Sequence, residues 1–126
     1  MIDALFNQPN YLAVKRMMDA TALQQQAVAS NLAHLETPGY RRLAVAPDFQ
    51  ADLRQALSAK NTHRLMELRP QLQTDPDAIA QRMDGNTVNL ETELLEQNKV
   101  TLAHALETHL LTGNLLRLRL AITGRS

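Results

Sequence analysis

The stretch SNLAHLETPGYRRL, residues 30–43, decides how the chain is arranged, because a long helix pattern ends within it. Pro38 pushes Thr37 out of the α region, since the proline ring crowds the preceding backbone. Pro38-Gly39 is also the preferred central pair of a type II turn, in which proline fixes φ at about −65° and glycine accepts a positive φ. The sequence therefore predicts a helix that reaches Leu35, followed by a turn that sends the chain off in a set direction.

The helix before this turn is predicted to start at about Asn10, which can serve as its N-cap. It would be about 40 Å long at 1.5 Å per residue. Apolar or small residues recur along it at alternating spacings of three and four, which is typical of a coiled-coil seam with polar interruptions in its middle. The seam positions are Tyr11, Val14, Met18, Thr21, Gln25, Val28, Leu32 and Leu35.

The middle of the chain carries weaker signals. Residues 41–46 can be extended, and Asp48 could cap a short helix that places Phe49 and Leu53 on one face. The pattern fades over residues 60–83, where only a turn or two near 77–83 looks helical. Asp84-Gly85-Asn86 then indicates a tight turn.

The last predicted element is a helix from Asn89, a plausible N-cap, to about Thr123, with Gly124 as its stop. Its leucines fall on two sides, whereas a helix with one partner needs a single apolar stripe. We therefore expect self-association or assembly with neighbouring subunits to cover the leucines of the second side. One side carries Leu95, Leu102, Leu106, Leu116 and Leu120, and the roughly opposite side carries Leu111, Leu115, Leu118 and Ile122.

These patterns predict an all-α protein in which the long N- and C-terminal helices pair as an antiparallel coiled coil around an irregular middle segment. The expected parts are an N-terminal helix (1–36), a turn with a short helix and irregular chain (37–86), and a C-terminal helix (87–126), together one domain. Periodicity leaves open whether the two helices pair within one chain or between chains.

Composition excludes several classes of protein. Thirteen basic and thirteen acidic side chains cancel, which argues against a nucleic-acid partner. Cysteine is absent, so a disulfide framework and a cysteine-based zinc site are excluded. The N-terminus lacks the apolar core and cleavage site of a Sec-type signal peptide, and no apolar run approaches the roughly 20 residues that span a bilayer.

The sequence offers little for catalysis. A glycine-rich phosphate loop, a GxSxG elbow and a Ser/His/Asp arrangement are all missing. We expect no enzyme activity, cofactor, metal or small-molecule substrate. The candidates are interpreted as surface or interface histidines and as a solvated first turn of the last helix: His34, His63, His104 and His109, and Glu91, Glu93 and Glu96.

Two stretches resemble motifs of the bacterial flagellar rod and hook proteins. SNLAHLETPGY is similar to the ANxAN-x-x-TPGY signature of that family, with His34 as a departure. DGNTVNLETE, residues 84–93, resembles the DGNxVDLDxE segment that opens the C-terminal helix of the proximal rod proteins, with Asn89 where aspartate is usual. The motif residues are Asn31, Thr37, Pro38, Gly39, Tyr40, Asp84, Gly85, Asn86 and Val88.

The resemblance implies a structural subunit of the proximal rod of the flagellar basal body, which transmits torque and anchors the axial structure to the membrane ring. It also implies a periplasmic rod location, reached through the flagellar type III export apparatus without a cleaved signal peptide. The implied partners are further copies of the chain, other proximal rod proteins and the ring-to-rod adaptor. A small helical adaptor or regulator with a single protein partner is the alternative. The expected assembly interface is Val14, Met18, Val28, Leu32, Leu95, Leu102, Leu106, Leu111, Leu115, Leu118 and Ile122.

Overall fold

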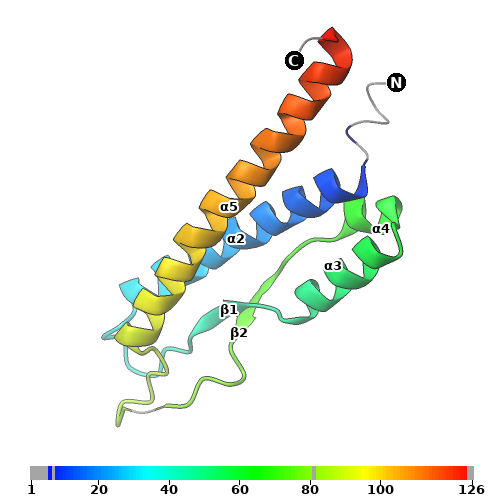
Figure 1. The fold of residues 1–126 in the computed structure, drawn as a ribbon. Coiled ribbons are helices and arrows are strands. Elements are labelled where there is room, and N and C mark those ends of the chain that lie inside the picture. The colour runs from blue at the N-terminus through cyan, green and yellow to red at the C-terminus, as the bar shows by residue number, and fades with distance from the viewer. Residues whose placement is uncertain (1–5, 7, 81, 125–126) are drawn as a thin grey trace.

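A computed structural model of the protein describes residues 6, 8–80 and 82–124. It is mostly helical, with 66% of residues in helices and 5% in strands, so the predicted dominance of helix is confirmed. A long C-terminal helix contacts the N-terminal helix, and the shorter elements lie between them in the chain (Figure 1). The elements in order are α2 (Pro9–Ala33), β1 (Leu43–Val45), α3 (Asp48–Ser58), α4 (Thr62–Glu67), β2 (Leu72–Thr74) and α5 (Leu90–Thr123).

Helix α2 begins two residues earlier than the capping pattern predicts. Pro9 is its first residue and Gln8 occupies the N-cap without a side-chain capping bond, so the prediction of Asn10 as the cap is wrong. Proline suits the first helical position because it lacks an N–H that would be unpaired there and its φ is already helical. The regular helix ends at Ala33, and residues 34–36 form turns before Pro38.

The middle segment is more ordered than predicted. Strands β1 and β2 pair antiparallel, with Leu43 opposite Thr74 and Val45 opposite Leu72. The predicted short helix is present as α3, but α4 was not predicted. Its N-cap is Asn61, whose side chain accepts the N–H of Arg64 at 3.0 Å.

Residues 77–80 and 82–83 contain no helix, contrary to the prediction of one or two helical turns there.

The apolar core lies between the N-terminal half of α2 and the pair α3 and α4, which run beside it in Figure 1. Leucine, alanine and one phenylalanine build it. Leu65 of α4 is completely buried. The buried members are Leu12, Ala13, Phe49, Leu53, Ala56, Leu65 and Leu68.

Helices α2 and α5 meet near the C-terminal half of α2 and the N-terminal half of α5, and they diverge farther along both helices (Figure 1). Polar side chains join them, and the partner numbers in α5 fall as those in α2 rise, so the helices run in opposite directions. The predicted polar interruptions of the α2 seam are therefore direct contacts with α5. The pairs are Thr21–Glu107 at 2.7 Å, Gln25–Gln97 at 3.1 Å and Asn31–Glu93 at 3.2 Å.

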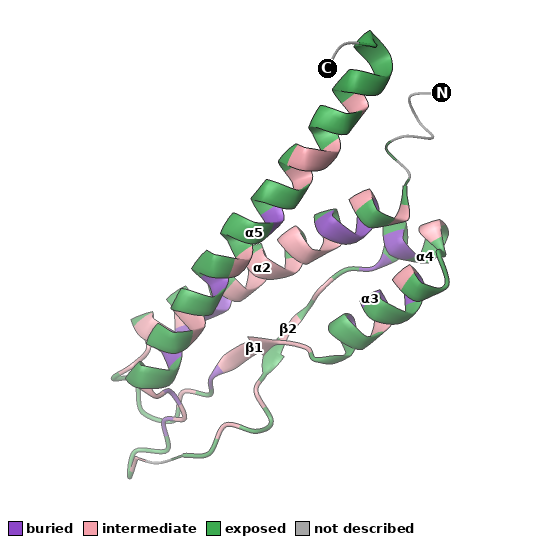
Figure 2. Cartoon of the chain, viewed as in Figure 1, coloured by how far each residue is buried: buried purple, intermediate pink, exposed green. Residues whose placement is uncertain are grey.

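Both predicted ends of α5 are confirmed. The Asn89 side chain accepts the N–H groups of Glu91 at 2.9 Å and Thr92 at 3.2 Å. Gly124 ends the helix with φ +63°, the left-handed conformation that favours glycine. Beyond Glu107 the helix projects from the rest of the chain and is mostly exposed (Figure 2).

Candidate functional site

The two motifs, far apart in the sequence, meet in the structure as two facing turns. Residues 37–40 form the predicted type II-like turn, in which the N–H of Tyr40 donates to the carbonyl of Thr37 at 3.3 Å and Gly39 has φ +71°. Gly85 has φ +78°, and a Cβ there would lie 3.7 Å from the Gly39 Cα. The Gly39 N–H donates to the carbonyl of Asp84 at 2.9 Å. We call the region where these turns meet the joint, made of residues 30–43, Asp75 and 84–93.

Asn86 closes the C-terminal end of α2 within the joint. Its side-chain amide donates to the carbonyls of His34 at 2.9 Å, Leu35 at 3.2 Å and Thr37 at 2.7 Å. Its side-chain oxygen accepts the N–H of Val88 at 2.7 Å. These carbonyls belong to the turns that follow Ala33, so Asn86 bonds the chain leaving α2 to the turn that precedes α5.

Asn31 makes the equivalent connection from α2. The side chain is fully buried and makes two hydrogen bonds with the backbone of Leu43. It donates to the Leu43 carbonyl at 2.9 Å and accepts the Leu43 N–H at 2.8 Å. The Tyr40 hydroxyl also donates to it at 3.3 Å, and its amide donates to Glu93 at 3.2 Å. One amide therefore holds together α2, the segment after the turn and α5.

A buried ion-pair network lies at the centre of the joint. Arg42 donates through Nε to Glu93, which is completely buried, and through Nη1 to Asp75 at 2.6 Å. Burial lowers the pKa of Arg42, but the hydrogen bonds and charges of Glu93 and Asp75 outweigh it and raise the pKa above its ordinary value. Arg42 is therefore held in its charged form. The prediction that Glu93 belongs to a solvated first turn is wrong, because Arg42 and Asn31 compensate its burial.

Aromatic packing covers one side of the joint. The rings of His34 and Tyr40 stack with centroids 4.4 Å apart and an angle of 3° between their planes. The Ser30 and Tyr40 hydroxyls lie 3.0 Å apart, and the His34 ring nitrogen Nδ1 lies 2.8 Å from the Ser30 carbonyl. His34 is thus half-buried and links Tyr40 of the turn to the last turn of α2.

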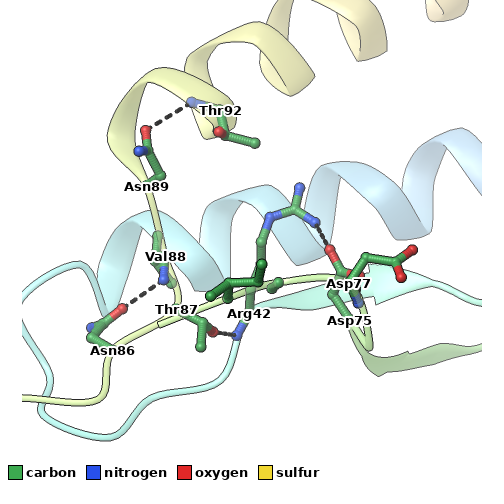
Figure 3. A pocket seen from close by; sticks show the side chains of 10 residues that line it. Arg42, Asp75, Asp77, Asn86, Thr87, Val88, Asn89 and Thr92 are labelled. Atoms are coloured by element: carbon green, nitrogen blue, oxygen red, sulfur yellow. Dashed lines mark hydrogen bonds and ion pairs between the residues drawn. The ribbon is translucent and has the colours of Figure 1, made fainter. Parts of the chain in front are cut away.

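An open hollow of about 250 Å³ lies beside Arg42, and the polar groups around it are bonded to one another (Figure 3). The Arg42 N–H donates to the Thr87 hydroxyl at 2.8 Å, and its guanidinium contacts Asp75. Among the described residues, no group of three His, Asp or Glu side chains could hold a metal ion. The bonds around the hollow fix the directions of α2 and α5.

The expected interface residues fall into three environments. Val14 and Val28 of α2 are buried, and Met18 and Leu32 are partly buried. Leu95, Leu102 and Leu106 of α5 face away from α2 and are 55%, 72% and 56% exposed. The buried residues on the α2-facing side of α5 are instead Glu93, Val100 and Glu107.

The remaining four lie where α5 has left α2. Leu111 and Leu118 are partly buried, while Leu115 and Ile122 are 44% and 63% exposed. At 100° per residue these four continue the α2-facing side of α5. The predicted side that contains Leu95 is therefore the outward side of α5, which faces away from α2. The predicted side that contains Leu111 continues the α2-facing side of α5 beyond its contact with α2.

The sequence reasoning missed Arg42, Asp75 and Thr87. Arg42 lies two residues after the first motif, and Glu93 is the last residue of the second motif. An antiparallel pair of terminal helices places the end of the first helix beside the start of the second, so the opposite charges of Arg42 and Glu93 near those ends were an available signal for an ion pair. Asp75 follows β2 and carried no signal, because its position depends on the pairing of the strands.

A scan against protein-family models finds no match to this chain, and a search of curated proteins also finds none. Within the part of the chain that the structure describes, none of the helices has the length and apolar character needed to cross a membrane.

Proposed function

We propose that the protein is a structural subunit of the proximal rod of the bacterial flagellar basal body, of the FlgB type. In this role it assembles through helix packing, transmits torque and anchors the axial structure to the membrane ring. The proposed work is mechanical, without catalysis or a cofactor. The observation that carries the proposal is the joint, in which the two stretches that resemble rod motifs bond to each other residue by residue.

The joint supports a mechanical role because it fixes the angle between two long helices with buried groups that have no other use. Asn31, Asn86 and Glu93 are each at most 1% exposed. Their side-chain bonds run between the two motifs, to Arg42 and Leu43 just after the first motif, or to the Val88 N–H. Buried polar networks that are fully bonded specify one arrangement at the expense of some stability. A subunit that carries torque needs such a fixed angle.

The exposed apolar side chains of α5 support assembly. Large exposed apolar surfaces on a soluble chain mark sites of association. We propose that in the assembled rod α2 and α5 extend their contact as an antiparallel coiled coil and that neighbouring subunits cover the leucines beyond it. The proposed neighbours are other copies, other proximal rod proteins and the ring-to-rod adaptor. The subunit would reach its periplasmic rod location through the type III export apparatus without a cleaved signal peptide.

The test is rod assembly in cells that lack the chain and receive it back on a plasmid. The complemented strain is expected to swim and to yield complete basal bodies, while the deletion strain yields none. A double variant, L115E/L118E, should export and fold but fail to restore the rod. The matched control is Thr108→Glu and Thr112→Glu, which adds the same charge at exposed polar positions of the same helix.

Normal motility of the deletion strain would contradict the rod proposal. So would full complementation by the L115E/L118E variant. If the same variant breaks one binary complex and leaves basal bodies intact, the adaptor alternative is the correct function.

A further inference from the structure

The outward side of α5 carries an apolar seam, interrupted by Asn98 and His109, that no other part of the described chain covers. Its members recur at spacings that add to heptads and lie within a narrow sector of the helix, opposite the side that contacts α2. The five leucines are 43–72% exposed. The outward seam consists of Leu95, Leu102, Leu106, Gly113, Leu116 and Leu120.

Gly113 is the most informative member of the outward seam. Glycine inside a helix is destabilising relative to alanine, so its place needs a reason. No described residue lies within 4 Å of the Cβ that another residue would have there, and its φ is not positive. Neither packing within the chain nor backbone conformation explains it. A partner whose side chain approaches the helix closely at this position would explain the glycine.

The order of residues along the outward seam fits a second copy running in the opposite direction. When the sequence is reversed against itself, Leu95 lies opposite Leu120 and Leu102 lies opposite Gly113. The small residue thus faces a leucine that stands 72% exposed in the single chain. In the same register Lys99 lies opposite Leu116, where its aliphatic stem can cover the leucine while the ammonium stays in water.

Charge favours this direction over the parallel one. A parallel pair would place Lys99 against Lys99 and Arg117 against Arg117, and would leave a gap between two glycines at position 113. An antiparallel pair brings the end that carries Glu91 beside the end that carries Arg117 and Arg119. The two helix dipoles also oppose each other in that arrangement.

We propose that the free protein forms a two-fold dimer through the outward seam of α5, with the two α5 helices antiparallel. Such an interface is isologous and closed, because the same seam is used on both copies and no outward seam is left to bind a third copy. The dimer would keep the leucines covered before assembly. It does not rest on the proposed function, since an adaptor with the same seam would form the same dimer.

Cysteine cross-linking tests both the partner and the direction, because the natural chain contains no cysteine. The variants Leu95→Cys and Leu120→Cys are purified separately and oxidised alone or mixed. A disulfide-linked dimer is expected in the mixture and not in either sample alone. Homodimeric disulfides in the separate samples would show a parallel pair and overturn the proposal.

Sedimentation equilibrium of the full chain gives the second readout. We expect a monomer–dimer equilibrium in which Leu102→Glu weakens association about tenfold or more, because the charge would be buried in the seam opposite Gly113. Gly113→Leu should also weaken association while raising the helix content of the monomer, a combination that misfolding does not produce. The control is Thr101→Glu, which is exposed on the adjacent side. A chain that stays monomeric, or associates equally well as Leu102→Glu, overturns the proposal and leaves the outward seam to a different protein.

Discussion

Glu93 is a carboxylate with no exposed surface, and its burial is tolerated because Arg42 and Asn31 both donate to it. Desolvation of two charges offsets most of the attraction between them, so such a pair adds little net stability. Removing one partner of the pair is nevertheless strongly destabilising, because the remaining buried charge then has no partner. The Arg42–Glu93 pair therefore acts as a specificity device that makes other positions of α5 unfavourable.

The first expected outcome concerns this residue. Glu93→Gln should lower the free energy of unfolding by about 3 kcal/mol, because it leaves the buried Arg42 without its closest counter-charge. Glu91→Gln is the matched control in the same helical turn. Glu91 is exposed, so losing its interaction with the helix dipole should cost about 0.5 kcal/mol. Denaturant unfolding of both variants measures the difference, and equal costs would contradict the role given to the ion pair.

The second prediction concerns the hydrogen bonds of the Asn86 side chain. Asn86→Ala removes the donors to the carbonyls of His34, Leu35 and Thr37, along with the acceptor for the Val88 N–H. The three carbonyls keep other donors, from Thr37, Arg82 and Tyr40, but the N–H of the buried Val88 loses its acceptor. An unpaired buried N–H is costly, and we expect a loss of about 2 kcal/mol in the free energy of unfolding.

The control for Asn86→Ala is Asn98→Ala on the exposed side of α5, which should change stability by about 0.5 kcal/mol at most. A small effect at position 86 would show that the end of α2 is fixed by something other than this side chain.

At the scale of the elements, the contact between α2 and α5 is more polar than a coiled-coil seam. Glu107 is buried at this contact, where the Thr21 hydroxyl donates to one of its oxygens. Its other oxygen, Oε2, has no hydrogen-bond partner among the described residues. The contact thus holds an uncompensated carboxylate at the point where the two helices begin to diverge.

The pH dependence of this contact follows from Glu107. Burial raises its pKa, and the Thr21 hydrogen bond and the charge of His104 lower it only in part. The folded protein therefore binds this proton more tightly than the unfolded chain does. The contribution of Glu107 to stability is then most favourable below the ordinary glutamate pKa and declines as pH rises through the raised one.

Glu107→Gln should remove this decline and raise the free energy of unfolding at neutral pH by about 1 kcal/mol, since the unpaired buried charge is gone. Unfolding of the natural chain and the variant is measured across the acidic to neutral range. The difference between them should widen as pH rises and then level off. A difference that is constant with pH would contradict the assignment to Glu107.

The elements that could be predicted from sequence are those whose cause is local. Pro38-Gly39 fixes the turn, Asn89 caps α5 and Gly124 stops it, each through its own backbone chemistry. Helix α4 and the β1–β2 pair were missed because their stability comes from contacts distant in sequence, such as Leu65 in the core and Leu43 opposite Thr74.

The residues of the candidate site also divide into those that could be predicted from local sequence and those that could not. Motif resemblance located Asn31 and Asn86, but the burial of Glu93 and its pairing with Arg42 depend on how the elements meet.

At the scale of the whole molecule, one end is stabilised by packing and hydrogen bonds, and the other end, the C-terminal half of α5, has few contacts with the rest of the chain. The core around Leu65 and the joint around Asn31 hold α2 from both sides, while α5 beyond Glu107 has only its own backbone bonds and a few partial contacts. Isolated helical segments of this length are marginal in water. Stability should therefore fall along α5 from its N-cap to its C-cap.

Amide hydrogen exchange should reveal that gradient. In dilute solution, where the two-fold dimer is dissociated, residues 93–107 should be protected nearly as well as the core, and residues 111–123 should exchange much faster through local opening. Raising the concentration should slow exchange in residues 111–123, because the outward seam becomes covered along the whole helix. The Leu102→Glu chain should show the fast pattern at both concentrations. Uniform protection of α5 in dilute solution would contradict this, because it would mean that the single chain already stabilises the helix beyond its contact with α2.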